Sequence, residues 1–302
     1  MPPTSPQPIG VVLLTGSEGT IGSHLQQALR DAGYHVRTLD RLPTTQPGRD
    51  HRVADLLDRS ALGAAMEGVT GIVHAAGIPW DVGDPSTVMA VNVIGTWNLL
   101  QACSDAGVDR VVALSSINAQ GSVGGWRAPD YLPIDDDHPH HPNTPYQLSK
   151  HLMEEVCRSF SERHGLTTIC LRPVFVAHTE SPHPARFGTV ASTQDWRDEF
   201  WAYVAVRDVC DAVVRSLEVP GRRHERLLLA ASDTSAAEPT RTLLAREHPE
   251  VPWPKVDPDT YFADDPYRSL VDPRRARDVL RWEARYSWRD GSAVAKEQGS
   301  KP

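Results

Sequence analysis

Residues 9–22 read IGVVLLTGSEGTIG, and this stretch decides the fold. Its first half, Ile9 to Thr15, is a short apolar run rich in branched side chains, which is typical of a buried strand. Gly16, Gly19 and Gly22 follow at intervals of three residues. A helix-forming segment, 21–32, begins between the second and third of them and ends before Gly33. A strand, a glycine-rich turn and a helix in direct succession predict a loop that cradles phosphate groups.

Each glycine of this loop has a separate physical role. Gly16 permits the tight turn, Gly19 lets the backbone approach a pyrophosphate, and Gly22 lets the helix pack closely on the strand. The start of the helix then offers unpaired backbone N–H groups to an anion. The predicted cofactor contacts in the loop are Gly16, Glu18, Gly19, Thr20, Ile21 and Gly22.

The next predicted strand, 35–40, ends in an acid, Asp40. A carboxylate at this position can accept hydrogen bonds from a free ribose 2′-hydroxyl and would repel a 2′-phosphate. This predicts NAD rather than NADP as the cofactor. Arg41 follows directly and could pair with a phosphate, so NADP stays open as the less favoured cofactor.

Short β-rich runs alternate with longer helical stretches along the chain, which predicts an α/β fold with a doubly wound parallel sheet. The predicted strands are 9–15, 35–40, 71–75, 110–115, 167–171 and 225–230, and the predicted helices are 21–32, 86–106, 145–164 and 206–217. Two proline-rich stretches break the alternation. The expected organisation is a flexible arm (1–8), a Rossmann domain (9–172 and 203–231), a small substrate-binding lobe (173–202 and 232–291) and a flexible tail (292–302).

Composition excludes several classes of protein. The net charge of −8 argues against a nucleic-acid binder, which needs a basic face. No apolar run reaches the roughly 18 residues of a membrane helix, and the first residues lack the basic start and apolar run of a secretory signal.

The cysteines are scattered without metal-ligand spacing, which predicts reduced core residues in a cytoplasmic protein. They are Cys103, Cys157, Cys170 and Cys210.

A candidate proton-transfer pair lies at the start of the helix 145–164. Tyr146 and Lys150 are four residues apart and therefore share one face of the helix. A free tyrosine titrates near pH ~10, but a neighbouring ammonium favours the phenolate and lowers the pKa. Tyr146 could then take a proton from a substrate hydroxyl while hydride leaves its carbon. On a helix without the glycine loop, such a pair would be interpreted as a surface contact.

The strand 110–115 leads into a second candidate, Ser116. Ligands of open parallel sheets bind at the carboxyl ends of the strands, where this serine lies. Its hydroxyl could hold the substrate oxygen against Tyr146, or it could simply cap the end of the strand.

These motifs together resemble the extended short-chain dehydrogenases, the NAD-dependent epimerase/dehydratase family. The resemblance implies roles for further residues: Asp55 and Leu56 beside the adenine, and Ala75, Ala76 and Gly77 along the cofactor ribose. It implies that Asn92 supports both the catalytic and the cofactor sites and that Lys150 also holds the nicotinamide ribose. It places Pro173, before the substrate loop, among the cofactor contacts. It also implies a homodimer formed through the long helices.

Two departures from the family pattern bear on the substrate. The family's nucleotide-sugar enzymes carry an asparagine a few residues after the Arg-Pro strand end, where this chain has Phe175. The dehydratases carry Asp-Glu after the catalytic hydroxyl, where this chain has Ile117 and Asn118. These departures disfavour a nucleotide sugar and a dehydration. The predicted substrate contacts are Ser116, Ile117, Asn118, Tyr146 and Phe175.

The sequence therefore predicts an NAD-dependent sugar epimerase or dehydrogenase that acts on a small-molecule substrate. The alternatives are an NADP-dependent ketone or aldehyde reductase and a catalytically silent NAD(P)-sensing protein. The run from Asp136 to His141 invites a metal interpretation, but its two prolines favour a solvated loop, and no metal site is predicted.

Overall fold

The computed structural model describes residues 10–44, 46, 48–178, 187–188, 194, 196–221 and 224–290. The chain divides into two compact units. The first unit is Met1–Ser115, Thr144–Cys170 and Val213–Glu225, and the second is Ser116–Asn143, Leu171–Ala212 and Arg226–Pro302. This division assigns Ser116–Asn143 to the second unit, whereas the sequence suggested the Rossmann domain. The predicted arm 1–8 and tail 292–302 lie outside the described residues.

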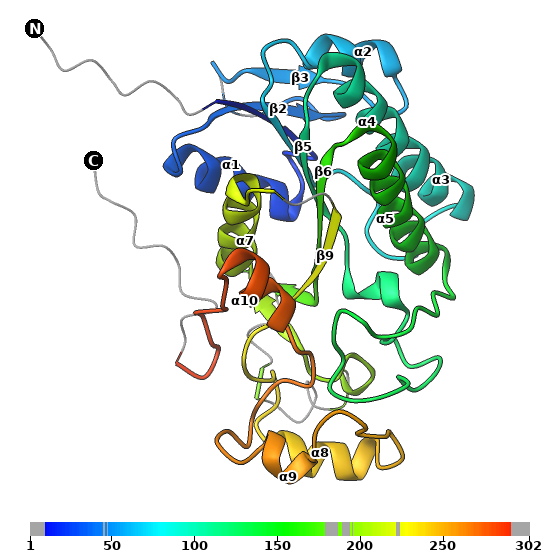
Figure 1. The fold of residues 1–302 in the computed structure, drawn as a ribbon, viewed down its shortest axis with the longest axis vertical. Helices are drawn as coiled ribbons and strands as arrows, with labels where there is room; N and C mark the ends of the chain where they lie inside the picture. The colour runs from blue at the N-terminus through cyan, green and yellow to red at the C-terminus, as the bar shows by residue number, and fades with distance from the viewer. Residues whose placement is uncertain are drawn as a thin grey trace, which may run out of the picture. The chain divides into compact units, whose positions relative to one another are not determined.

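Seven strands form one sheet in the order β3-β2-β1-β4-β5-β6-β9 (Figure 1). They are β1 (Val11–Thr15), β2 (His35–Asp40), β3 (His51–Val53), β4 (Gly71–His74), β5 (Arg110–Leu114), β6 (Thr167–Pro173) and β9 (His224–Leu229). Strand β1 pairs in parallel with β2 on one side and with β4 on the other. The strand order therefore reverses beside β1, where ligands of such sheets bind. The prediction of a doubly wound α/β fold is confirmed.

Helices of the first unit lie on both faces of this sheet. Figure 1 shows α4 (Gly95–Ala106) and α5 (Pro145–His164) side by side on one face, with α1 (Thr20–Asp31) on the other. The remaining helices that follow strands are α2 (Arg59–Ala65), α3 (Pro85–Met89) and α7 (Val206–Glu218). The predicted helix 145–164 is confirmed at both ends, since Thr144 and Gln147 form a capping box and Gly165 ends the helix in a left-handed conformation.

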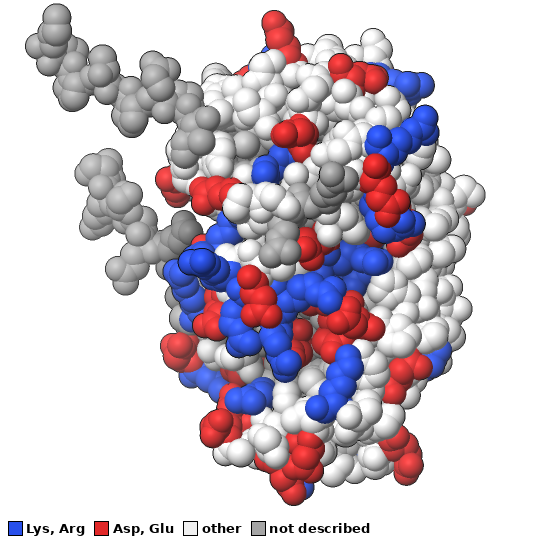
Figure 2. Space-filling view, viewed as in Figure 1, with Lys and Arg blue, Asp and Glu red and all other residues white. Residues whose placement is uncertain are grey.

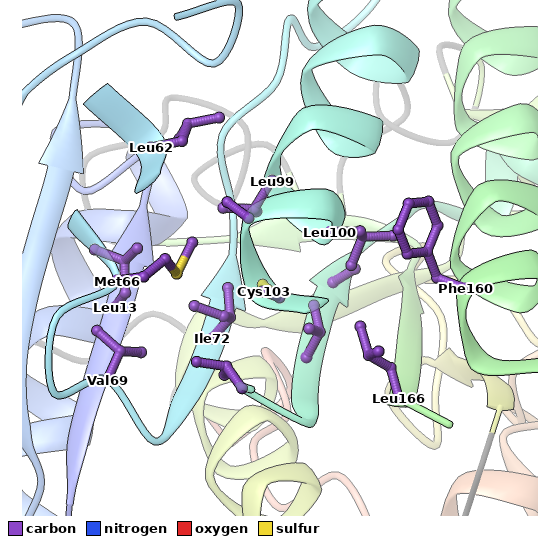
Figure 3. Close-up of a cluster of buried hydrophobic side chains, with 14 of the residues drawn as sticks. Leu13, Leu62, Met66, Val69, Ile72, Leu99, Leu100, Cys103, Phe160 and Leu166 are labelled. Carbon is purple, nitrogen blue, oxygen red and sulfur yellow. The ribbon is translucent and has the colours of Figure 1, made fainter. Parts of the chain in front are cut away.

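A cluster of apolar side chains packs the sheet against α4 and α5 (Figure 3). It joins Leu13 of β1 and Ile72 of β4 with Leu99 and Leu100 of α4 and Phe160 of α5. All five are almost completely buried. Burial of side chains of this size contributes about 1.5–3 kcal/mol each to the free energy of folding. The cluster therefore sets the position of α5, which carries Tyr146, and of α4, which begins three residues after Asn92.

One predicted helix is interrupted. The stretch 86–106 forms α3, then a π-helical turn, η1 (Ala90–Ile94), and then α4. A π-turn inserts one extra residue into the helix and re-aims the side chains that follow, and such turns are frequent at functional sites. Asn92 lies in this turn. Hydrophobic periodicity does not reveal such an insertion, so the sequence predicted one continuous helix.

The described part of the second unit contains several short elements. A two-stranded parallel sheet pairs β7 (Phe175–Ala177) with β8 (Tyr203–Ala205). The short helices are η2 (Ile117–Gln120), η4 (Arg197–Glu199), α8 (Thr240–Glu247), α9 (Pro258–Tyr261) and α10 (Arg274–Leu280). On the face drawn in Figure 2, basic and acidic side chains are interspersed. The ion pairs Arg274–Asp272 and Arg275–Asp137 belong to this unit.

A membrane-spanning helix was also sought among the residues that the structure describes. None of their helices combines the length and the apolar composition that crossing a bilayer requires.

We expect Gly22→Ala to destabilise the fold, because a methyl group on Gly22 would overlap the carbonyl oxygen of Gly16. The backbone of the loop would have to shift, and forcing extra atoms into a packed site costs about 1–3 kcal/mol. Gly63→Ala is the matched control. Gly63 lies in α2 with open space around it, and alanine in a helix interior is more favourable than glycine by about 0.5–1 kcal/mol.

Urea unfolding of both variants measures these effects. A Gly22→Ala protein as stable as the wild type would mean that the close approach of helix and loop is not needed.

Candidate active site

A cavity of about 310 Å³ lies in the first unit beside the glycine loop. Ten of the residues predicted to bind the cofactor line it: Gly16, Glu18, Gly19, Asp40, Arg41, Asp55, Leu56, Ala75, Ala76 and Gly77. They come from four separate stretches of the chain, which follow β1, β2, β3 and β4. The sheet therefore brings together at one edge the motifs that the sequence spreads over 62 residue positions, from 16 to 77.

The glycine loop forms a cradle for an anion. Gly16 has a left-handed backbone (φ 70°), its N–H donates to the Leu39 carbonyl at 2.8 Å, and its carbonyl accepts from the N–H of Gly19 at 3.1 Å. Helix α1 begins directly after Gly19, which caps it without a side-chain hydrogen bond, and its first turn has no acidic side chain. Thr20 and Ile21 thus belong to a first turn whose N–H groups suit a phosphate group.

The carboxylate of Asp40 is held in a fixed orientation at this cavity. Its Oδ2 accepts the Glu18 backbone N–H at 3.0 Å, and its Oδ1 accepts the N–H of Leu42 at 3.0 Å. Carboxylate oxygens have further lone pairs, so Asp40 can also accept hydrogen bonds from hydroxyl groups. The residues present therefore fit a dinucleotide with a free ribose diol. Arg41 lines the same cavity.

Asn92 ties the end of this cavity to α5. Its side chain accepts the Ile78 N–H at 2.8 Å, and its Nδ2 donates to the Ile78 carbonyl at 3.0 Å and to Ser149 Oγ at 2.9 Å. A methyl group on Gly77 would lie 3.0 Å from Asn92 Oδ1 and 3.7 Å from Lys150 Nζ. Gly77, Asn92 and Lys150 therefore meet at one point. The role of Ser149 as the partner of Asn92 was not predicted.

Lys150 is buried and anchored. Its Nζ donates to the Leu114 carbonyl at 2.8 Å. Burial lowers the pKa of Lys150 to about 8, while the neighbouring Glu154 carboxylate acts in the opposite direction. Glu154 is fully buried and accepts a hydrogen bond from Ser115 Oγ at 2.6 Å. Near neutral pH the ammonium is therefore retained in a low-dielectric site, where its charge acts strongly on neighbouring groups.

Tyr146 occupies the first turn of α5, one turn before Lys150. Its backbone N–H donates to Asp81 Oδ1 at 2.7 Å, and its ring lies 6.2 Å from that of Trp80, centroid to centroid. Neither Asp81 nor Trp80 was singled out by the sequence. They follow a proline in a loop, with no periodicity that would mark them.

His74 stabilises the carboxyl end of β4 through hydrogen bonds to two threonines. Its Nδ1 and Nε2 lie 2.8 Å from Thr15 Oγ1 and 2.9 Å from Thr96 Oγ1. Burial, and then the charge of Lys150, lower the pKa of His74 to about 3. The imidazole is neutral at physiological pH and fixes the strand end from which Ala75, Ala76 and Gly77 follow.

The other predicted site residues belong to the second unit. Ser116 caps the short helix η2, and its Oγ accepts the Asn118 backbone N–H at 3.1 Å. Ile117 is buried in that helix. Pro173 ends β6. Phe175 packs against the ring of Trp196, with centroids 4.9 Å apart.

The loop from Asp136 to His141 differs from the solvated loop that the sequence suggested. Asp136 and His138 are buried. Asp136 Oδ1 accepts the Leu228 N–H at 2.7 Å, and His138 Nε2 accepts the N–H of Asp130 at 3.0 Å. The polar side chains of this loop thus hold the second unit together. No group of three or more His, Cys, Asp or Glu side chains suited to a metal ion occurs in the described part of the chain.

Residues 12–228 match the NAD dependent epimerase/dehydratase family. A UDP-glucose 4-epimerase of Azospirillum brasilense is 30% identical over 93% of this chain and 89% of its own length. A uronate dehydrogenase of Pseudomonas syringae pv. tomato is 30% identical over 56% of this chain and 60% of its own. A short-chain dehydrogenase/reductase superfamily protein from Agrobacterium tumefaciens, solved with bound NAD, superposes with a TM-score of 0.71 at 26% identity, covering 94% of this chain and 96% of that one.

The buried, neutral His74 predicts a specific acid sensitivity. Its pKa in the folded protein lies below that of an unfolded histidine, so its stabilising contribution is complete above pH ~6.5 and is lost as the pH falls toward 3. Between pH 7 and pH 5 this loss is about 2 kcal/mol. We expect His74→Gln, which cannot take up a proton, to reduce the loss of stability over this interval by that amount.

Urea unfolding at the two pH values measures the difference. His164→Gln, at an exposed position at the end of α5, is the control for the replacement of a histidine by glutamine and should change the pH dependence by less than His74→Gln does. Equal pH dependence in His74→Gln and the wild type would contradict the assignment.

Proposed function

The chain belongs to the NAD dependent epimerase/dehydratase family, and we propose that it oxidises a secondary alcohol of a sugar or sugar-derived substrate. The observation that carries the proposal is that Lys150 and Asn92 meet at Gly77, at the end of the glycine-loop cavity, while Tyr146 lies one turn before Lys150 on α5. A general acid/base beside a buried ammonium, next to a dinucleotide site, suits reversible removal of a proton and a hydride.

The cofactor is NAD, which accepts a hydride from the substrate carbon when it is bound. We propose that the N–H groups of the glycine loop and of α1 hold its pyrophosphate and that Asp40 holds the adenosine ribose diol. Asp55 and Leu56 line the cavity where an adenine would lie, and Ala75 to Gly77 continue along it. Lys150 and Asn92 stand at Gly77, the end of the cavity that suits the nicotinamide ribose.

Tyr146 is the proposed general acid/base. Its phenolic oxygen takes the proton from the substrate hydroxyl during oxidation and returns it in the reverse direction. The Lys150 ammonium favours the phenolate form, since an opposite charge nearby stabilises the ionised group. Glu154 keeps Lys150 protonated in its buried position. Ser116, Ile117, Asn118 and Phe175 are the proposed substrate contacts of the second unit.

Two fates of the oxidised product correspond to two candidate reactions. In a dehydrogenase the ketone leaves, and in an epimerase it is reduced again on the opposite face. The uronate dehydrogenase relative supports the first reaction, and Phe175, packed against Trp196 in place of an amide, supports a substrate without a nucleotide. The UDP-glucose 4-epimerase that matches nearly the whole chain supports the second reaction, with a nucleotide sugar.

A panel of free sugars, uronates, UDP-glucose and UDP-galactose separates these candidates. Net formation of NADH identifies a dehydrogenase. Interconversion of UDP-glucose and UDP-galactose without net NADH identifies an epimerase.

We also propose that the protein is a cytoplasmic homodimer. The three apolar side chains Ile94, Trp97 and Leu148 of η1, α4 and α5 are 54%, 43% and 38% exposed. The part of the surface in Figure 2 where Figure 1 shows α3 and α5 bears few charged side chains. A face of this kind suits burial against a second copy of the chain. All four cysteines are free and buried, which suits a reducing compartment.

We expect Asp40→Ala to reduce the preference for NAD over NADP by roughly 10-fold or more, because repulsion of the 2′-phosphate disappears with the carboxylate. Calorimetric titration of both cofactors into the two proteins measures the ratio of dissociation constants. Asp105→Ala, which removes a carboxylate at a position outside the cavity, should leave the ratio unchanged. An unchanged ratio in Asp40→Ala would show that the Asp40 carboxylate does not discriminate between the two cofactors.

We expect Tyr146→Phe to lower the turnover number by roughly 10²–10⁴-fold, since it removes only the ionisable oxygen. The dissociation constant of NAD should stay within about twofold of the wild type, because the oxygen acts on the substrate. Tyr34→Phe removes a phenolic oxygen outside the cavity and is the control. Near-normal turnover of the identified substrate by Tyr146→Phe would refute the proposed mechanism.

A further inference from the structure

Trp80 is an exposed aromatic side chain beside the proposed acid/base. Its side chain is 57% exposed, more than that of Trp97 or Trp126. Burial of an indole is strongly favourable, so a ring that stays in solvent forgoes a large hydrophobic contribution. The ring of Tyr146 lies beside it, with centroids 6.2 Å apart and planes inclined by 37°.

The chain on either side of Trp80 is fixed by hydrogen bonds. Two residues before Trp80, the N–H and the carbonyl of Ile78 are both bonded to the buried Asn92 side chain. One residue after it, Asp81 Oδ1 accepts the backbone N–H of Tyr146 at 2.7 Å. Trp80 is therefore the exposed tip of a short segment that is tied at one end to the cavity and at the other to the first turn of α5.

The backbone of Trp80 is strained. Its φ of 62° is in the left-handed region, which glycine and asparagine adopt readily and a bulky side chain does not. Strained residues of this kind persist where the surrounding structure determines them, and they cluster at ligand sites. Glycine or asparagine would serve the turn better, so the indole has a use that offsets the strain.

The position of the ring indicates what that use is. Because the two ring centroids are 6.2 Å apart, a substrate of sugar size whose hydroxyl meets the Tyr146 oxygen lies within reach of the indole. A pyranose ring has hydroxyl groups around its edge and C–H groups on its faces. The flat, electron-rich indole face matches the C–H face, while polar groups match the edge.

We propose that Trp80 is a substrate-binding residue whose indole packs against the C–H face of a sugar ring that presents its hydroxyl to Tyr146. This inference rests on the proposed function, because it requires a sugar substrate. It adds a specificity determinant from the loop after β4: a ring with an apolar face is accepted, and an acyclic polyol of the same size is bound less well.

Trp80→Asn and Trp80→Phe together test the inference. Asparagine tolerates the left-handed backbone and removes the ring, so the KM for the sugar should rise roughly 3- to 10-fold. The turnover number, the affinity for NAD and the Tm should not fall by more than they do in the control Val82→Ala, which alters an exposed side chain of the same loop. Trp80→Phe retains an aromatic face and should restore most of the wild-type KM.

Three outcomes would overturn the inference. An unchanged KM in Trp80→Asn would show that the sugar does not contact the ring. A lower Tm together with weaker NAD binding in Trp80→Asn would give the ring a structural role only. A wild-type protein that turns over no sugar of the panel overturns the proposed function and this inference with it, whereas the first two outcomes leave the proposed function intact.

Discussion

The close approach of helix α1 to the glycine loop is the contact on which the site depends. Gly22 lies against the carbonyl of Gly16, and Gly16 in turn lies against the backbone that follows β4 at Ala76. Because no side chain intervenes, the start of α1, the end of β1 and the end of β4 meet at the point where the strand order reverses. The cavity exists because three backbone segments can approach one another here.

Around this point the protein buries polar groups at an energetic cost. Lys150, Glu154, His74 and Asn92 are all buried, and each of them is hydrogen-bonded. Removing an ammonium or a carboxylate from water is unfavourable unless it is paired and hydrogen-bonded. The same burial strengthens the action of Lys150 on its surroundings. The π-turn at Asn92 and the strained backbone at Trp80 are further local departures from regular structure, and all of them concentrate at one end of the cavity.

The second unit is stabilised in a different way. The two strands of its small sheet, β7 and β8, hold three residues each, and the described helices that lie wholly within this unit are short. Side-chain hydrogen bonds and aromatic contacts take the place of long regular elements. Asp136 bonds the backbone of β9, and Tyr203 donates to Asp233 at 2.6 Å. A charged loop such as Asp136 to His141 is usually solvated, and the structure buries two of its members because they satisfy backbone groups that would otherwise lack partners. Sequence composition alone does not distinguish these two situations.

The sequence by itself determined the doubly wound fold, the order of the main strands and helices, and ten of the residues that line the cavity. Hydrophobic periodicity and glycine spacing are local signals, and they sufficed for the fold, the glycine loop and Asp40. The contacts at Asp55, Leu56 and Ala75 to Gly77 came from the family resemblance. Only the tertiary structure decided the π-turn at Asn92, the burial of Glu154 and Asp136, and the position of Trp80 beside Tyr146. Each of these depends on contacts between residues far apart in the chain, 65 positions in the case of Asp81 and Tyr146, and such contacts leave no periodic trace in the sequence.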